Sequence, residues 1–416
     1  MSSTVVFLEA NATGTTFEAM QKARAWGCHL VFVTMDRPFY AELVDNPLEL
    51  AHEVVDCDTY DPVAVLRALG GMAVDAIVSF DDYHLPVAAL CAMALGLPHA
   101  DVNSLMAARY KDLMRQRLAG LPGAVRSQVM TEAELQSTDL QALEYPLVVK
   151  PIDESGSVAV RLCRGPADVE QALAQFGQHQ VNLRRYRPVR AMLVEEYVDG
   201  DEYSCELLWD RRCEEWSVVG ITRKILAPPP FFVEAGHVFP AELPNELAEK
   251  IEARVLMWLK ALDLRCAAAH IELRVRDGEP TLIEVNPRLA GGFITKLVLW
   301  TTGIDMVEHY LAYHLREARP APDQPPRHGS AAIRFVLSSE LQSKAQARRI
   351  DELLPGLPSV VQHKLKVAAD PHKAPARSNY DRLGYVLLGT APGQAIQSSL
   401  DALDELFNST PQTEEA

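Results

Sequence analysis

Strand-length apolar segments alternate with helix-like segments over roughly the first hundred residues, and this alternation constrains the fold more than any other feature. Buried strands are predicted at residues 4–9, 29–35 and 74–80. Helices are predicted at residues 17–26 and 86–95. Strands that alternate with short helices are typical of βαβ units on a parallel sheet. We therefore expect an α/β domain at the N-terminus.

Several common motifs are absent from the sequence. The loop at residues 9–16 has one glycine and lacks the G-x-G-x-x-G pattern, so neither a nicotinamide nor a flavin is expected there. The G-x-x-x-x-G-K-[ST] phosphate loop and the G-x-S-x-G elbow are also missing. The seven cysteines form no C-x-x-C pair, which argues against a disulfide framework or a zinc site.

Length and charge limit the classes of protein and partner. The 416 residues predict two to four compact units at about 150 residues each. The net charge of −16 argues against nucleic acid or an anionic membrane as a partner. No apolar run reaches the ~18 residues of a membrane span, and the first residues lack the basic region of a secretory signal. We expect a cytoplasmic protein, and a local phosphate site stays open.

The later segments predict a mixture of helices and strands. Helices are expected at residues 104–118, which are basic, and at 244–262 and 292–312. Strands are expected at residues 145–151, 158–162, 268–275 and 281–285, within the strand–turn–strand region 191–220, and in a small α+β unit that begins at residue 330. Irregular structure is expected in the arginine-rich, solvated loop 178–190, the Pro/Phe-rich loop 227–243 and the linker 319–329.

Two glutamates are embedded in apolar strands that flank an Asp-Gly turn. Glu272 and Glu284 would face each other across this hairpin, since antiparallel strands bring such side chains within ~5 Å. Two carboxylates with the amide oxygen of Asn286 are hard ligands suited to Mg²⁺. The alternative is two glutamates on the solvated face of a hairpin. Arg288 weakens this alternative, because a guanidinium beside a metal site suits phosphoryl binding.

A lysine at the end of a buried strand precedes a loop of small residues. Lys150 is followed by Ser155, Gly156 and Ser157, whose backbone N–H groups could approach phosphate oxygens. The alternative is an ordinary Ser/Gly turn between two strands, which is the commoner reading of this loop taken alone.

An apolar strand runs into an acidic segment at residues 193–204, which contains Gly200 and Glu202. Taken alone, this segment reads as a solvated acidic turn. Together with the two preceding motifs and their order along the chain, it becomes more specific.

These motifs in this order resemble the ATP-grasp superfamily of carboxylate–amine ligases, over residues 1–320. The resemblance implies an α/β ATP-grasp fold with an α+β C-terminal part. It implies a Rossmann-like N-terminal domain, the basic helix plus a mobile lid domain, a catalytic domain and a small C-terminal α+β subdomain, at residues 1–103, 104–195, 196–320 and 321–416, respectively.

The resemblance also implies roles for individual residues. The ATP phosphates would be contacted by Lys111, Lys150, Ser155, Gly156 and Ser157. Adenine would be bound by Glu195 and by the backbone of Glu196 and Val198, and the ribose by Glu202. Mg²⁺, usually two ions and replaceable by Mn²⁺, would be held by Glu272, Glu284 and Asn286. The catalytic residues would be Lys150 and Arg288, with Arg288 stabilising the transferring phosphate.

The implied chemistry activates a carboxylate, which is itself a poor acyl donor. Transfer of the γ-phosphoryl group of ATP creates an acyl phosphate with a good leaving group. An amine then attacks, giving an amide, ADP and phosphate. Closure of the lid would keep water from the acyl phosphate.

Residues 220–243 resemble most closely the L-amino-acid ligases, which form dipeptides and often serve antibiotic pathways. Glu234 would recognise an α-ammonium group, with His237 nearby. The substrate carboxylate would be bound by Arg288, Gly291 and Gly292. A loop histidine bonded to backbone is the alternative for His237, and Gly292 is hypothesised to make room for a larger first substrate.

Other readings stay open. Arg223 and Lys224 are either further anion contacts or a solvated pair. The chain as a whole could be a ligase or carboxylase of the purine-precursor type, or a non-catalytic ATP sensor. The Glu234/His237 segment favours amino acids as the small-molecule partners, and a homodimer is left open.

Overall fold

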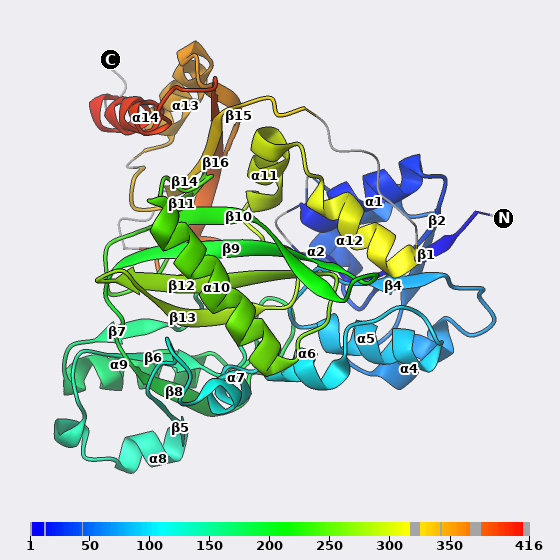
Figure 1. Cartoon of the computed structure of the whole chain (residues 1–416), viewed down its shortest axis with the longest axis horizontal. Helices are drawn as coiled ribbons and strands as arrows, with labels where there is room; N and C mark the ends of the chain where they lie inside the picture. The colour runs from blue at the N-terminus through cyan, green and yellow to red at the C-terminus, as the bar shows by residue number, and fades with distance from the viewer. Residues whose placement is uncertain are drawn as a thin grey trace.

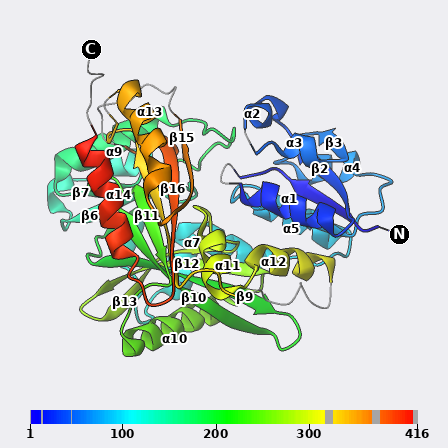
Figure 2. The same ribbon diagram turned by 90° about the horizontal axis from the view of Figure 1, so that it is seen from above.

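Three β-sheets organise the part of the chain that the computed structural model describes (Figures 1 and 2). The described residues are 2–11, 14–43, 45–316, 325–341, 343–366 and 376–410. One sheet is parallel and four-stranded, one is antiparallel and four-stranded, and one is antiparallel and eight-stranded. No described helix is long and apolar enough to cross a membrane.

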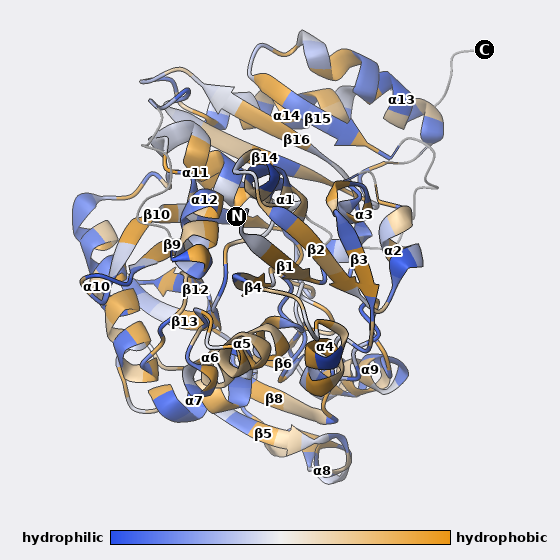
Figure 3. Cartoon of the chain, turned by 90° about the vertical axis from the view of Figure 1, so that its right-hand side faces the viewer, coloured by the Kyte–Doolittle hydropathy of each residue, from blue (hydrophilic) through white to orange (hydrophobic). Residues whose placement is uncertain are grey.

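The N-terminal unit is the predicted α/β domain. Its parallel sheet has the order β3-β2-β1-β4, from the strands β1 (Thr4–Leu8), β2 (His29–Thr34), β3 (Glu53–Asp56) and β4 (Ala76–Val78). Its helices are α1 (Thr15–Ala25), α2 (Arg37–Ala41), α3 (Pro47–Leu50), α4 (Pro62–Ala68) and α5 (Leu85–Ala94). The two central strands are apolar and buried because helices cover both faces of the sheet (Figure 3). Glu9 follows β1 and Asp36 follows shortly after β2, and they lie 3.6 Å from Arg184 and 2.9 Å from Arg185, respectively.

Two predicted long helices are each broken in two. The basic helix consists of α6 (Val102–Arg109) and α7 (Lys111–Leu118), with the extended residue Tyr110 between them. The break lets the N–H of Lys111 bond to the carbonyl of Ile152, which brings Lys111 to the lid. The predicted helix 292–312 consists of α11 (Ile294–Thr302) and α12 (Met306–Leu315), separated at Gly303, whose φ is +80°.

The predicted lid region carries an antiparallel sheet of order β5-β8-β6-β7. Its elements are β5 (Ser127–Thr131), α8 (Glu132–Ser137), η1 (Leu140–Ala142), β6 (Leu147–Pro151), β7 (Arg161–Cys163), α9 (Pro166–Gln178) and β8 (Ala191–Glu196). The prediction of a solvated loop at residues 178–190 is wrong for Arg184, whose side chain is only 8% exposed. It lies 2.8 Å from Asp81 and donates to Tyr40, so it joins the lid to the N-terminal unit.

The large sheet carries most of the candidate site. Its order is β13-β12-β9-β10-β11-β14-β16-β15. The strands are β9 (Asp201–Asp210), β10 (Glu215–Leu226), β11 (Glu234–Phe239), β12 (Ala268–Arg276), β13 (Glu279–Asn286), β14 (Ser330–Leu337), β15 (Val360–Leu365) and β16 (Arg382–Thr390). The predicted hairpin of β12 and β13 is confirmed. The loop predicted at residues 227–243 is wrong in part, since it contains β11.

Helices cover the two ends of the large sheet. Figure 1 shows α10 (Asn245–Leu262) crossing the sheet over β9 and β13, where Trp258 is fully buried. The other helical elements are α13 (Lys344–Leu353), η2 (Leu354–Gly356), η3 (Asn379–Asp381) and α14 (Gln397–Ser409). Figure 2 shows α13 and α14 on the side away from the N-terminal unit. Strands β14–β16 continue the sheet of the predicted catalytic domain; the four-part division at residues 103, 195 and 320 stays a proposal. The predicted linker lies largely outside the described residues.

Candidate functional site

The two candidate metal carboxylates lie opposite each other on the hairpin. Glu272 on β12 and Glu284 on β13 are register partners, which confirms the predicted juxtaposition. Asn286 follows on the same strand as Glu284, two residues further, and pairs with His270. Glu284 Oε1 is 2.9 Å from the ammonium of Lys111. The hairpin therefore presents two carboxylates and an amide next to a lysine predicted to contact phosphate.

A buried ammonium, that of Lys224 on β10, joins three of the predicted site residues. It lies 3.1 Å from Glu202, 2.8 Å from Glu234 and 2.9 Å from Glu272. The side chain is 1% exposed, so a solvated pair with Arg223 is wrong for Lys224. Burial acts to lower the pKa of Lys224, but the three carboxylates hold it well above its usual value. The carboxylates predicted to bind ribose, amine and metal thus meet at one cation.

A polar chain continues from Glu272 into the core. Glu272 Oε1 lies 3.2 Å from His270 Nε2, and His270 Nδ1 lies 2.9 Å from Glu206. Glu206 is fully buried and accepts hydrogen bonds from Ser204 and Thr222. Burial acts to lower the pKa of His270, but Glu206 and Glu272 raise it to about 9. The imidazolium of His270 lies between Glu206 and Glu272 and fixes the orientation of the Glu272 carboxylate.

The predicted adenine residue Glu195 lies between two buried cations. Lys150 forms an ion pair with one carboxylate oxygen, and Arg115 Nε lies 2.7 Å from the other. Arg115 also donates to two backbone carbonyls of β13, each at 2.9 Å. Burial acts to raise the pKa of Glu195, but both cations hold it below its usual value. Glu196, in contrast, pairs with the exposed Arg126.

The acidic segment after β8 is held in place by Gly200 and Arg274. Gly200 has a φ of +117°, and a Cβ there would lie 2.1 Å from the carbonyl oxygen of Val275. Arg274 donates to Glu202 and to the carbonyl of Val198, both at 2.9 Å. The predicted ribose and adenine positions are thereby held by one guanidinium.

The small-residue loop links three parts of the molecule. Gly156 and Ser157 both have positive φ values, +70° and +60°, so the loop is not a regular hairpin turn. Ser155 bonds to the hydroxyl of Tyr83 in the N-terminal unit. Ser157 donates to the carbonyl of Phe232 at 2.7 Å. These contacts hold the loop against the N-terminal unit and against the segment between β10 and β11.

Arg288 is held by the N-terminal unit. Its guanidinium forms a bidentate pair with Asp82, with both N–O distances at 2.6 Å. Burial acts to lower the pKa of Arg288, but Asp82, Glu284 and Glu272 raise it. The predicted catalytic arginine is therefore electrostatically coupled to the candidate metal carboxylates while a third carboxylate holds it in place.

The predicted amine-binding residues are brought together on β11. Arg382 NH2 lies 2.8 Å from Glu234 Oε2. His237 Nε2 is 3.4 Å from the same oxygen, outside hydrogen-bond geometry, and Nδ1 is 3.2 Å from the carbonyl of Gly292. A Cβ at Gly292 would lie 2.6 Å from the His237 ring, so the space beside this glycine is filled by histidine and does not widen a pocket there. Gly291 and Gly292 lie between β13 and α11.

The donor set suits a hard cation. Among the described residues, no three His, Cys, Asp or Glu side chains form a cluster that could hold a metal unaided. Glu272, Glu284 and Asn286 supply two carboxylates and one amide oxygen. Mg²⁺ is commonly bound by one or two carboxylates, with water and substrate phosphates completing the octahedron. The residues present fit such an ion, with its remaining ligands supplied from outside the protein.

Sequence reasoning missed three residues of this site, Asp82, Arg115 and Glu206, and left Lys224 open between an anion contact and a solvated pair. Glu206 had the same signal as Glu272, a carboxylate within an apolar strand. Arg115 lies one helical turn beyond Lys111, which places both on one face of α7. The pairing of Asp82 with Arg288 joins residues far apart in the chain, and no local pattern announces it.

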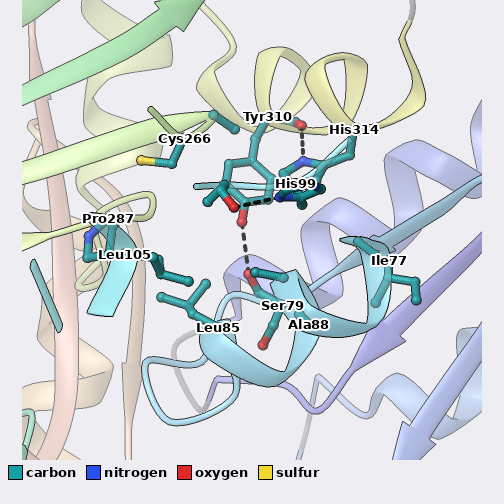
Figure 4. A pocket seen from close by; sticks show the side chains of 14 residues that line it. Ile77, Ser79, Leu85, Ala88, His99, Leu105, Cys266, Pro287, Tyr310 and His314 are labelled. Atoms are coloured by element: carbon teal, nitrogen blue, oxygen red, sulfur yellow. Dashed lines mark hydrogen bonds between the residues drawn. The ribbon is translucent and has the colours of Figure 1, made fainter. Parts of the chain in front are cut away.

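A small cavity lies between the N-terminal unit and α12, and Pro287, which follows Asn286, is among the residues that line it (Figure 4). Its volume is about 20 Å³, enough for about one water molecule. Tyr310 donates to the carbonyl of Ser79 beside it, and burial lowers the pKa of the adjoining His314 to about 4. The cavity is too small for a substrate.

Comparison with known proteins gives matches to two domain families and to similar chains. Residues 143–296 match the ATP-grasp domain, and residues 20–99 match the ATP-grasp N-terminal domain. The chain is 27% identical to the uncharacterized protein y4rH of Sinorhizobium fredii, over 97% of this chain and 83% of that protein. It is 25% identical to the alanine–anticapsin ligase of Bacillus subtilis, over 67% of this chain and 63% of that protein. The crystal structure of an L-amino acid ligase from Bacillus licheniformis has the same fold, with a TM-score of 0.78, 21% identity and coverage of 98% and 97% of the two chains.

Proposed function

The chain belongs to the ATP-grasp superfamily, and we propose that it is an ATP- and Mg²⁺-dependent ligase that couples the carboxylate of one amino acid to the amine of another. The products would be a dipeptide or related amide, ADP and phosphate. Similarity to an alanine–anticapsin ligase supports this class of substrate. We further propose a role in the synthesis of a peptide antibiotic or another secondary metabolite.

One observation carries the proposal: the Lys224 ammonium contacts Glu272 and Glu234 at 2.9 and 2.8 Å. Glu272 is the candidate metal ligand, and Glu234 is the candidate partner of a substrate amine. A phosphate held through Mg²⁺ at the first carboxylate and an amine held at the second would lie close to each other, on either side of Lys224. Coupling an activated carboxylate to an amine requires this proximity.

The residues of the chain would divide the work as follows. Glu272, Glu284 and Asn286 would hold Mg²⁺, which supplies charge neutralisation for the phosphoryl groups. Lys111 and Lys150 would bind phosphate oxygens, and Glu202 the ribose. Arg288 would stabilise the transferring phosphate, either by breaking its ion pair with Asp82 or by contacting the phosphate and Asp82 at the same time.

Water must be kept from the acyl phosphate while the amine approaches. The small-residue loop at Gly156 is bonded to the N-terminal unit through Ser155 and to the segment between β10 and β11 through Ser157. Exclusion of water by this loop would favour the amine over hydrolysis. Glu234 would orient the amine by accepting a charge-assisted hydrogen bond from its ammonium form, before loss of a proton frees the attacking lone pair.

The test is phosphate release with ATP, Mg²⁺ and a panel of amino-acid pairs, with product masses measured in parallel. We expect release that requires two amino acids and Mg²⁺, and a product mass equal to the pair minus water. Tight ATP binding without release for any pair would instead favour a sensor. Release that requires bicarbonate or a purine precursor would favour the other ligase class.

A further inference from the structure

A short segment of the C-terminal unit, Ser378–Arg382, reaches the candidate substrate residues from outside the predicted catalytic domain. Asn379 accepts a hydrogen bond from the N–H of Glu234 at 3.0 Å. The N–H of Asn379 donates to the carbonyl of Gly156 at 3.1 Å. The segment thus connects the small-residue loop, at Gly156, with strand β11, at Glu234.

The segment is ordered by its own hydrogen bonds. Ser378 and Asp381 form a capping box around η3, in which each side chain bonds to the backbone of the other end. Arg382 then opens β16, which pairs with β14 along its length. A segment anchored in this way can hold a side chain at a fixed place in the site.

Arg382 donates hydrogen bonds to both the main-chain carbonyl and the side-chain carboxylate of Glu234. Its NH2 is 2.9 Å from the main-chain oxygen of Glu234 and 2.8 Å from Oε2. The guanidinium stacks on the ring of Phe335 at 3.7 Å, which fixes its plane. The other carboxylate oxygen of Glu234 contacts Lys224, so the carboxylate is oriented from both sides.

Tyr380 lies against the small-residue loop at Gly156. A Cβ at Gly156 would lie 3.3 Å from the Tyr380 ring, so the glycine lets the ring approach the loop. Burial of the phenol and the nearby carboxylates of Asp81, Asp82 and Glu154 raise the pKa of Tyr380 to about 12. The residue is 44% exposed, so its side chain is partly open to solvent.

We propose that Ser378–Arg382 forms a wall of the amino-acid pocket, in which Arg382 is the positioning residue for Glu234 and Tyr380 limits the size of the bound amino acid. The ligand is an α-amino acid that offers its ammonium group to Glu234. The proposal rests on the proposed ligase function. It adds that the specificity of the site is set in part by the C-terminal unit.

The experiment compares Arg382→Met and Arg382→Lys with a matched control, Arg334→Met, in the full-length protein. Arg334 lies on the neighbouring strand β14, is 14% exposed against 13% for Arg382, and pairs with Glu340 away from the site. We expect the KM of the amine-donating amino acid to rise about tenfold or more in Arg382→Met, since a hydrogen bond to a charged group is lost, with the KM of ATP within about twofold. Arg382→Lys should recover part of the loss.

Tyr380→Ala should shift the preference among amino acids toward larger side chains, while Tyr380→Phe should keep the wild-type preference. If the wild type is active and Arg382→Met changes the amino-acid KM no more than Arg334→Met does, the positioning role is wrong although the ligase function stands. An equal rise in the KM of ATP would also overturn it. A wild type that releases phosphate with no amino-acid pair refutes the proposed function itself.

Discussion

Replacing Lys224 by methionine tests whether its buried ammonium organises the site. The substitution keeps the length of the side chain and its burial but removes the charge. It would leave Glu202, Glu234 and Glu272 close together with fewer positive charges among them. Removing one partner of a buried ion pair costs about 3–5 kcal/mol, because the remaining charge is left without compensation. We expect a loss of this size in the free energy of unfolding at pH 7.

The pH dependence sharpens the prediction. Burial acts to raise the pKa values of Glu234 and Glu272, but Lys224 and the other cations hold them below the usual value. Carboxyls with lowered pKa values stabilise the fold above about pH 4.3, and this stability is lost as the pH falls further. Lys224→Met removes the main cause that lowers the pKa values of Glu234 and Glu272, while burial, which raises them, remains. Acid unfolding of the variant should therefore begin at a higher pH than in the wild type.

The measurement is urea unfolding at pH 7 and an acid titration of the folded fraction, for the wild type, Lys224→Met and Lys250→Met. Lys250 pairs with Glu279 on the surface, and its side chain is 39% exposed. Loss of an exposed pair is expected to cost only about 0–1 kcal/mol. If both variants lose the same stability, or if the acid midpoint of Lys224→Met is unchanged, the reasoning about the buried cation is refuted.

Three further outcomes are expected. Glu284→Gln should raise the Mg²⁺ concentration for half-maximal phosphate release about tenfold, and an unchanged titration would remove it from the metal site. Gly200→Ala should lower the free energy of unfolding by about 2 kcal/mol or more, since its Cβ would meet the carbonyl of Val275. Gly278→Ala, whose Cβ would point into open space, should lower it by about 1 kcal/mol. Equal losses for the two variants in urea unfolding would contradict this reasoning. As the pH falls from about 6.5 to 4, the histidine of the unfolded chain binds a proton while the buried His314 does not, so the wild type loses stability. His314→Asn should reduce this loss. If the urea midpoints at pH 7 and pH 5 differ as much in the variant as in the wild type, the reasoning is wrong.

The features that the sequence predicts best are those with local causes. The hairpin of Glu272 and Glu284 follows from two apolar strands of suitable length and the Asp-Gly turn between them. The α/β character of the N-terminal unit follows in the same way from the alternation of strands and helices. In both cases neighbouring residues decide the structure, so spacing along the chain is sufficient.

The rest depends on contacts between distant segments. The break between α6 and α7 occurs at Tyr110, an ordinary residue, and the N–H of the next residue bonds to a carbonyl of the lid. Strand β11 was read as a loop because proline and phenylalanine surround it, yet β10 and β14 on either side complete its hydrogen bonds. The sequence leaves Lys224 open between an anion contact and a solvated pair, since only the fold brings three carboxylates to it.

The ion pairs bear on how nucleotide and metal would bind together. The negative charge of the chain, −16 overall, says little about the site, because each cation expected to meet phosphate is already paired with a carboxylate. Lys111 contacts Glu284, and Arg288 contacts Asp82. A phosphate that forms an ion pair with Lys111 would break the pair between Lys111 and Glu284. The carboxylate of Glu284 would then lack a counter-charge, and Mg²⁺ bound to this carboxylate would supply one. Binding of ATP and of Mg²⁺ should therefore strengthen each other by the same factor, since coupling between two ligands is reciprocal.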